Sequence, residues 1–382
     1  MRRFFFGLWT FTALVHLVFF AAAREVLARI GAPQPALLAL AAALALLALL
    51  RPRLDLLAHD RPISRLRRGL ELLYFTHWCG AVAGTFLCVA GGSLLLVGTL
   101  GARITGEPAP FPHGELFVTS YGLGFALSAY GVWFRRRRAR IRRIEIPVPE
   151  LDPALDGYRI AQLSDLHIGS LLTKKGAARW IRAANAERAD LVALTGDYVT
   201  NGVSFHEDIA DTLAGLRAAD AVVAVLGNHD YFGHGEPLAS LLRERGILLL
   251  RNERCTVTRA GASLEIAGVD DTWTRRADVD RTMDGWDGSR PLIALSHDPA
   301  LFPDFARHGA ALVLAGHTHW GQLGLPFAAQ RYNLARRVFR FSAGLYREEG
   351  STLYVSPGLG TSGPPVRFGS PPEITVFTLR RG

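Results

Sequence analysis

The sequence predicts an α/β domain that is preceded by an all-α transmembrane bundle. The first 143 of the 382 residues contain long stretches without a charged residue. The remaining residues alternate short apolar runs with stretches of helical spacing, and such Val-, Leu- and Ala-rich runs are typical of strands that helices cover on both faces. We therefore expect a transmembrane region at residues 1–143, ending in a basic anchor, and a globular domain at residues 144–382.

The transmembrane region is predicted to contain four helices. A bilayer core about 30 Å thick needs roughly 20 apolar residues of helix. The predicted spans are residues 4–23, 32–50, 72–100 and 116–134. The second span depends on the short Ala and Leu run Ala36–Leu50, so three spans are the alternative. His16 and His77 lie inside the spans, and we interpret them as packing or interface residues.

The N-terminus also partly fits a cleaved signal peptide, because Arg2 and Arg3 precede the apolar run and Ala21–Ala23 follow it. The length of this run and the spans after it favour a retained helix. With the N-terminus inside, 15 arginines lie on the cytoplasmic side of the spans and 3 lie outside. The positive-inside rule then places the globular domain in the cytoplasm, at the inner membrane.

The net charge of the globular domain limits the classes of partner that it can bind. Residues 144–382 hold 25 Lys and Arg against 28 Asp and Glu, a net charge of −3, whereas residues 1–143 carry +12. A nucleic-acid-binding domain normally presents a basic face. We therefore expect no nucleic-acid partner, and nothing in the sequence indicates an obligate protein partner.

Five predicted strands of the globular domain end in polar residues. In open α/β sheets the carboxyl ends of the strands meet at one edge, where ligands bind. We expect the polar side chains to lie together there, although they are far apart in the sequence. They are Asp165, His167, Asp197, Asn228, His229, Asp230, His297, His317 and His319.

These residue types predict a metal site. Carboxylate, amide oxygen and imidazole groups bind divalent cations such as Mn, Fe or Zn, and the lack of thiolates excludes a structural zinc finger. Two aspartates, one asparagine and four histidines among these residues are seven potential ligands. They exceed what one tetrahedral ion can use and suit two ions. Two adjacent ions stabilise the attacking and the leaving oxygen of a displacement at phosphorus, and they lower the pKa of a bridging water to give hydroxide.

The order of these residues resembles the calcineurin-like metallophosphoesterase superfamily. The matching blocks are DLH at 165–167, GD at 196–197, GNHD at 227–230, His297, and GHTH at 316–319. The resemblance covers about residues 155–380. It implies a four-layered α/β/β/α sandwich with a two-metal site at the edge of its sheets.

The resemblance also implies a role for each residue. The first metal would be held by Asp165, His167 and His319, the second by Asn228, His297 and His317, and Asp197 would bridge both. His229 would face the substrate, holding a phosphoryl oxygen or protonating the leaving group. Asp230 would orient His229.

Two further segments indicate which branch of the superfamily the chain resembles. The run Gly196–Gly202 lacks the second aspartate and the arginine that serine/threonine protein phosphatases carry there, which argues against a protein phosphatase. The tail at 358–379 resembles bacterial membrane-associated phosphodiesterases. A related branch hydrolyses the pyrophosphate bond of UDP-2,3-diacylglucosamine in lipid A synthesis, and in that context Arg367 is a candidate phosphate contact.

We therefore expect a membrane-anchored phosphoesterase with two divalent ions. It would hydrolyse a phosphodiester or pyrophosphate bond of a lipid-linked or membrane-proximal substrate by a metal-bound hydroxide. One alternative is a UDP-2,3-diacylglucosamine pyrophosphatase. Another is a transporter or receptor with an accessory domain, which is disfavoured because the apolar cores of the spans hold no charged residue and every metal ligand is present. A nuclease is disfavoured by the net charge of −3.

Overall fold

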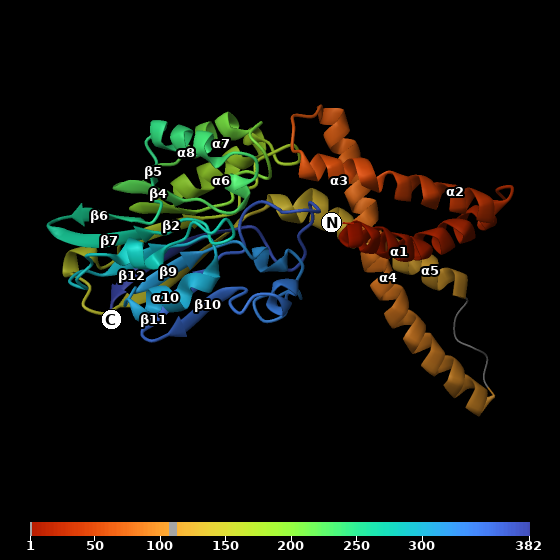
Figure 1. Ribbon diagram of the computed structural model, residues 1–382. Coiled ribbons are helices and arrows are strands. Elements are labelled where there is room, and N and C mark those ends of the chain that lie inside the picture. The colour runs from red at the N-terminus through yellow and green to blue at the C-terminus, as the bar shows by residue number, and fades with distance from the viewer. Residues whose placement is uncertain (1, 107–112) are drawn as a thin grey trace. The chain divides into compact units, whose positions relative to one another are not determined.

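The computed structural model describes residues 2–106 and 113–382, which form two compact units (Figure 1). The first unit comprises Met1–Leu56 and Ser64–Phe134, and the second comprises Leu57–Ile63 and Arg135–Gly382. The short segment Leu57–Ile63 thus belongs to the second unit, although it lies between two stretches of the first in the sequence.

The first unit is helical. Its helices are α1 (Arg2–Arg29), α2 (Pro35–Ala48), α3 (Leu50–Ala58), α4 (Arg65–Thr105) and α5 (His113–Ala129). Within the described residues, four stretches are long and apolar enough to cross a membrane, namely Phe6–Arg29, Pro35–Ala58, Arg65–Thr105 and Gly114–Arg137. Their number agrees with the predicted spans, but each extends beyond the predicted bounds. At the start of α4, for example, Ser64 Oγ accepts a hydrogen bond from the main-chain N–H of Arg67 at 3.2 Å and caps the helix.

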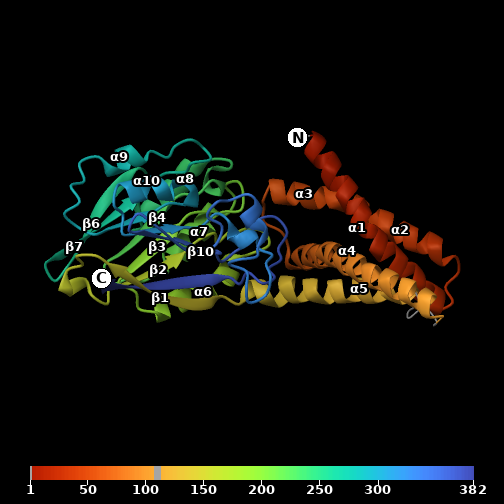
Figure 2. The same ribbon diagram turned by 90° about the horizontal axis from the view of Figure 1, so that it is seen from below.

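Glycines allow α4 and α5 to lie alongside each other closely (Figure 2). A Cβ atom at Gly124 would come within 2.5 Å of the main chain of both Gly80 and Gly84. Small residues at such contacts let two helix backbones approach, which is the usual basis of helix packing in membranes.

The histidines of the bundle join three of its helices. His77 in α4 contacts Tyr121 of α5 through Nδ1 at 2.9 Å, and its Nε2 lies 3.0 Å from Nε2 of His16 in α1. His16 Nδ1 lies 2.7 Å from the carbonyl oxygen of Thr12, which can only accept. These contacts fit the packing role that the sequence predicts for both histidines.

The second unit contains two six-stranded sheets. The first has the order β1-β12-β2-β3-β4-β5 and the second the order β10-β11-β9-β8-β7-β6. The first sheet consists of β1 (Arg140–Val148), β2 (Arg159–Leu163), β3 (Leu191–Thr195), β4 (Ala221–Val225), β5 (Leu248–Leu249) and β12 (Glu373–Arg381). The second consists of β6 (Glu253–Arg259), β7 (Ala262–Gly268), β8 (Leu292–Leu295), β9 (Leu312–Ala315), β10 (Gly344–Glu348) and β11 (Ser351–Val355).

Both sheets are mixed. The strands from β2 to β5 are parallel, and β12 runs antiparallel to β2. In the second sheet, β7, β8, β9 and β11 are parallel, while β6 and β10 are antiparallel partners at the two edges. Parallel strands bring their carboxyl ends to the same edge, which sets where the polar residues meet.

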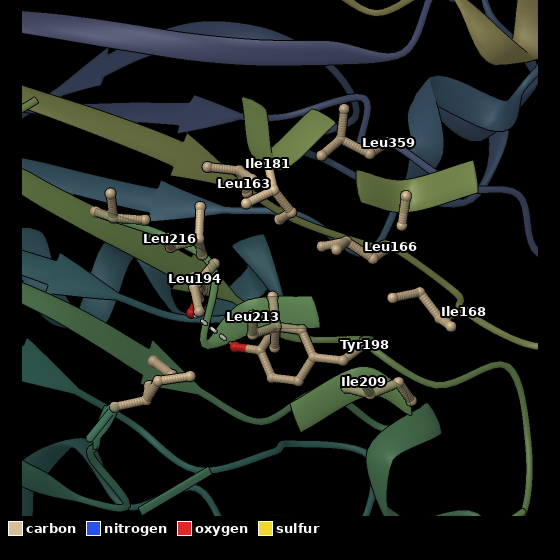
Figure 3. Packing of buried hydrophobic residues seen from close by; sticks show 14 of the residues in the cluster. Leu163, Leu166, Ile168, Ile181, Leu194, Tyr198, Ile209, Leu213, Leu216 and Leu359 are labelled. Atoms are coloured by element: carbon tan, nitrogen blue, oxygen red, sulfur yellow. Dashed lines mark hydrogen bonds between the residues drawn. The ribbon is translucent and has the colours of Figure 1, made fainter. Parts of the chain in front are cut away.

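Three apolar clusters separate four layers. One cluster lies between the first sheet and helices α6 (Lys174–Ala186), α7 (His206–Leu213) and α8 (Gly235–Glu244) (Figure 3). A second cluster fills the space between the two sheets. The third packs α9 (Val279–Met283) and α10 (Phe302–Arg307) against the second sheet. This arrangement confirms the predicted α/β/β/α sandwich.

The beginning of the sandwich differs from the predicted boundary. Residues Arg140–Arg143, which the sequence analysis assigns to the basic anchor, already lie in β1 and pair with β12. Arg140 bonds to Glu373 of β12 at 2.6 Å, and Arg143 bonds to Glu187 at 2.8 Å. Acidic partners therefore hold part of the arginine run on the sheet.

Candidate metal centre

All predicted metal-binding residues follow the carboxyl ends of five strands. Asp165 and His167 follow β2, Asp197 follows β3, and Asn228 and His229 follow β4; His297 follows β8, and His317 and His319 follow β9. The two sheets thus contribute to one site. Three overlapping sets of side chains lie close enough to hold a metal ion: Asp165, His167 and His319; His167, Asp197 and His229; and Asp197, His297 and His317.

Short distances between ligand atoms define the centre. Nε2 of His319 lies 3.3 Å from Oδ1 of Asp165 and 3.0 Å from Nε2 of His167. On the other side, Nε2 of His297 lies 3.2 Å from Oδ2 of Asp197 and 3.1 Å from Nδ1 of His317. Oδ2 of Asp197 is also 3.6 Å from Nε2 of His167, so Asp197 lies between both groups.

Main-chain carbonyl groups orient two of the ligand imidazole rings. Nδ1 of His167 lies 3.1 Å from the carbonyl oxygen of Val199, and Nδ1 of His297 lies 2.7 Å from that of Thr195. Because a carbonyl oxygen only accepts, each Nδ1 carries a proton and Nε2 is the atom that faces the other ligands, which is the arrangement of a metal-binding histidine.

The donor set fits a divalent cation. Among the described residues, the buried Oδ1 of Asn228 and Nε2 of His317 have no hydrogen-bond partner. Leaving a buried polar atom unpaired is unfavourable, and a bound metal would satisfy the amide oxygen. Nitrogen and oxygen donors without a thiolate suit Mn, Fe or Zn.

The backbone of the ligand loops is strained. Five of the residues adopt positive φ angles between 47° and 69°: Asp165, His167, Asp197, His317 and His319. Residues other than glycine rarely adopt this left-handed conformation, and it costs about 1–3 kcal/mol each. Such strain persists only where the surrounding structure enforces it, and it is concentrated at functional sites.

Comparison with known proteins identifies the family. The calcineurin-like phosphoesterase family matches residues 158–321. An uncharacterized metallophosphoesterase of Bacillus subtilis is 32% identical over 229 residues, which are 59% of this chain and 80% of that protein. The chain belongs to the calcineurin-like metallophosphoesterase family. A transmembrane protein with metallophosphoesterase domain of Danio rerio is 32% identical over 328 residues, or 82% of this chain and 74% of that protein.

Membership confirms the predicted enzyme class. The chain is a metal-dependent phosphoester hydrolase, and its four apolar helices, with the likeness to a transmembrane relative, indicate a membrane protein. The relation to the UDP-2,3-diacylglucosamine branch stays a prediction.

Asp230 has another position in this metallophosphoesterase than the sequence predicts. Its Oδ2 accepts from the amides of Gly227 and Asp197, each at 2.9 Å, and its Oδ1 accepts from Tyr198 at 2.8 Å and Val199 at 3.2 Å. The imidazole of His229 instead bonds through Nδ1 to the carbonyl oxygen of Thr200 at 2.6 Å. The fully buried Asp230 carboxylate therefore fixes the main chain that carries Asp197.

Arg367 lies behind His319. The guanidinium is fully buried and donates from NH2 to Nδ1 of His319 at 3.1 Å and to the carbonyl oxygen of Pro357 at 2.7 Å. Its Nε donates to the carbonyl oxygen of Gly360 at 2.8 Å. Because guanidinium groups only donate, Arg367 turns Nε2 of His319 towards the other ligands. The predicted phosphate contact of Arg367 stays a prediction.

Burial and charge shift the pKa values of the centre. Burial raises the pKa of Asp165 to about 6 and lowers that of His167 to about 3. Burial alone would raise the pKa of Asp197, but the positive charge of His297 lowers it well below its usual range. Burial opposes the charge on His297 too, yet the Asp197 carboxylate raises its pKa to about 10. Burial and the Asp197 charge raise the pKa of Asp230 to about 7, against the opposing effect of its amide donors.

Sequence reasoning missed a segment that supports the loops of the site. Oδ1 of the buried Asp60 accepts from the amide of Ser170 at 3.0 Å, and the side chain of Asn201 donates to the carbonyl oxygen of Ala58. Gly169 has no side chain where a Cβ atom would overlap Oδ2 of Asp60. Asp60 lies between two predicted spans, and no motif there indicates such a contact.

Thr200 was also missed. Its hydroxyl donates to the carbonyl oxygen of His167 at 3.1 Å, and its own carbonyl oxygen holds His229. One residue thus links a metal-binding loop to the histidine predicted to face the substrate. A threonine in a loop gives no signal of this kind in a sequence.

Aromatic residues surround the open side of the centre. His229 and His317 are the only half-buried members of the predicted site, whereas the others are buried. The ring of His229 lies 4.6 Å from that of Phe232, and the ring of His317 lies 5.3 Å from those of both Trp273 and Phe339. Apolar rings therefore lie beside the two histidines that are not fully buried.

Proposed function

We propose that the chain is a membrane-anchored phosphoesterase with a dinuclear metal centre that hydrolyses a phosphodiester or pyrophosphate bond. The position of Asp197 is the main support: its Oδ2 lies 3.2 Å from Nε2 of His297 and 3.6 Å from Nε2 of His167. One carboxylate oxygen thus faces ligands of two groups, as a bridging residue requires.

The chain offers enough donors for two ions. The first would be held by Asp165, His167 and His319, the second by Asn228, His297 and His317, with Asp197 shared. When bound, the ions would supply the electrostatic stabilisation of a displacement at phosphorus and would lower the pKa of water.

The side chains around the ions would orient the substrate. The carbonyl oxygen of Thr200 accepts from Nδ1 of His229, and Nε2 of His229 lies 3.5 Å from the hydroxyl of Ser362. When it carries a proton, Nε2 would hold a phosphoryl oxygen or donate that proton to the leaving oxygen. Asp230 would keep Asp197 in place through the main chain, and Arg367 would keep the ring of His319 in place. Phe232, Trp273 and Phe339 would contact an apolar part of the substrate beside His229 and His317.

The substrate is proposed to be lipid-linked or membrane-proximal. The apolar rings beside His229 and His317 and the four apolar helices support this assignment. The arginine distribution supports a catalytic domain at residues 144–382 on the cytoplasmic side of the inner membrane. UDP-2,3-diacylglucosamine is one candidate substrate.

Metal depletion and reloading test the proposal. Purified full-length protein treated with chelator should lose hydrolysis of a chromogenic phosphodiester and regain it with Mn. Elemental analysis should find two ions per chain, and Asp197→Ala should lose both. His317→Ala and His319→Ala should lose different ions. The control is His308→Ala, because His308 is partly exposed at the end of α10 and contacts Asp280, which is not a predicted ligand.

The result that would refute the proposal is equally direct. Full activity of Asp197→Ala or His229→Ala would show that the reaction occurs elsewhere. Binding of a single ion would refute the dinuclear centre. A panel of UDP-2,3-diacylglucosamine, lipid phosphates, cyclic nucleotides and simple mono- and diesters would then identify the substrate class.

A further inference from the structure

Residues 323–340, which we call the basic–apolar loop, follow the last metal-binding block directly. Positive charge is concentrated in this loop, although residues 144–382 together have a net charge of −3. The loop contains no Asp or Glu and four arginines, namely Arg331, Arg336, Arg337 and Arg340. Arg340 pairs with Glu348 at 2.8 Å, so Arg331, Arg336 and Arg337 make the loop a cationic region on an otherwise acidic domain.

The same loop exposes large apolar side chains. Five of them are more than half exposed: Leu325, Phe327, Tyr332, Leu334 and Val338. Phe327 is fully exposed. Single exposed apolar residues are normal, but several gathered in one segment mark a surface that binds a partner.

Hydrogen bonds order the loop. The amide of Gly324 donates to the carbonyl oxygen of Phe368 at 2.9 Å, and the amide of Leu325 donates to that of Tyr332 at 2.9 Å. The side chain of Asn333 accepts from the amide of Arg336 at 3.0 Å and caps a short 3₁₀ turn. A folded segment thus holds the apolar side chains outward.

The loop reaches the open side of the metal centre. Near its end, the ring of Phe339 lies 5.3 Å from that of His317, and His317 is one of the two half-buried members of the site. Any surface that covers the loop therefore lies next to the place where substrate enters.

We propose that the basic–apolar loop docks on the surface of an anionic lipid bilayer. Apolar and aromatic side chains interleaved with arginines, without an acidic residue, match the boundary between acyl chains and anionic headgroups. Arginine can bury its aliphatic stem while its charged end contacts lipid phosphate. The chain also carries four helices able to cross a membrane, so a bilayer is among the surfaces that the protein meets.

This docking deepens the proposed function, on which it rests for the nature of the substrate. The loop would hold the metal centre at the lipid surface, where a phosphate ester with an apolar portion is presented. The docking itself is tested without turnover, so its failure and the failure of the proposed function give different results.

A fluorescent label in the loop tests the proposal. Full-length protein in which Cys79, Cys88 and Cys255 are replaced by alanine receives Phe327→Cys, is labelled with an environment-sensitive dye and is placed in vesicles. In equimolar phosphatidylcholine and phosphatidylglycerol, the emission should shift to shorter wavelength and be lost when nitroxide-labelled lipid is included. The matched control is Leu248→Cys on β5, an exposed apolar position outside the loop, which should stay accessible to aqueous iodide.

Charge reversal in the basic–apolar loop provides a second test. Each arginine near an anionic surface contributes about fivefold in affinity, so Arg336→Glu with Arg337→Glu should abolish the quenching by lipid, as should high salt. An unchanged thermal midpoint shows that this variant is folded. Emission at position 327 equal to that at 248 in these vesicles, with and without the nitroxide-labelled lipid, would overturn the proposal. A blue shift that grows with protein concentration and resists lipid quenching would assign the surface to a second copy and overturn it too.

Discussion

Asp230→Asn tests whether the carboxylate holds the main chain of the metal-binding loops. Each oxygen of Asp230 accepts two amide hydrogen bonds. In either orientation, the amide group of asparagine replaces one oxygen with a donor that faces two N–H groups. Two buried amides then lose their acceptor, and at about 1–3 kcal/mol for each the free energy of unfolding should fall by about 2–6 kcal/mol.

Thermal unfolding of the detergent-purified protein measures this effect. For a domain of this size, 1 kcal/mol corresponds to a shift of about 2–4 °C, so the midpoint should fall by at least about 4 °C. Metal affinity should fall as well, because the amide that Asp230 binds belongs to Asp197. Asp280→Asn, whose side chain is almost fully exposed, is the isosteric control and should stay near the parent midpoint.

The alternative role predicted from the sequence gives a different result. If Asp230 acted by orienting His229, the variant would lose turnover while its midpoint and metal content stayed unchanged. That outcome, or a midpoint within about 1 °C of the parent, would refute the structural reasoning.

Three further predictions concern the same region. Asp60→Ala should lower the free energy of unfolding by about 1–3 kcal/mol because the buried amide of Ser170 loses its acceptor, whereas Asp60→Asn keeps the oxygen and should behave like the parent in chemical denaturation; equal stability of the two variants would contradict this. Chelation should lower the thermal midpoint by about 5 °C or more if metal had been present at about 100 times its dissociation constant, and an unchanged midpoint would show that no metal binds the folded state alone. In the metal-free protein the raised pKa of His297 predicts a contribution that is complete below pH 6.5 and lost as the pH rises through about 10. On the acid side, the lowered pKa of Asp197 means that its contribution is lost only at low pH, whereas the lowered pKa of His167 removes stability as the pH falls below 6.5. Stability should therefore decline on both sides of neutral pH, and His297→Asn should flatten only the alkaline decline.

Strand ends made much of the site predictable. A buried apolar run such as Leu312–Ala315 fixes a strand, and a parallel strand delivers the residues after it to a shared edge. The sequence pattern alone therefore places His317 and His319 beside Asp165. The four-layered sandwich followed from the family resemblance, and the structure confirms it.

The supporting contacts could not be read from the sequence because they depend on tertiary packing. Asp60 is 110 positions from Ser170 in the sequence, and its segment resembles any loop between two apolar helices. The resemblance of the tail at 358–379 made Arg367 a candidate phosphate contact, but its burial behind His319 depends on how that tail folds back. Likewise, Asp230 follows His229 directly in the chain, yet its side chain bonds to main-chain amides rather than to that histidine.

The positive φ angles of the ligand loops bear on how such a site is lost or kept. Glycine adopts this conformation without a steric penalty, so replacing Asp165 or His319 by glycine would relax the backbone while removing a ligand. A chain that no longer needed its metals would therefore become more stable by accumulating glycines at these positions. This chain instead places aspartate or histidine at five left-handed positions. The lower stability is kept together with the metal ligands that activity requires, which indicates an active enzyme rather than one that has lost its metal site.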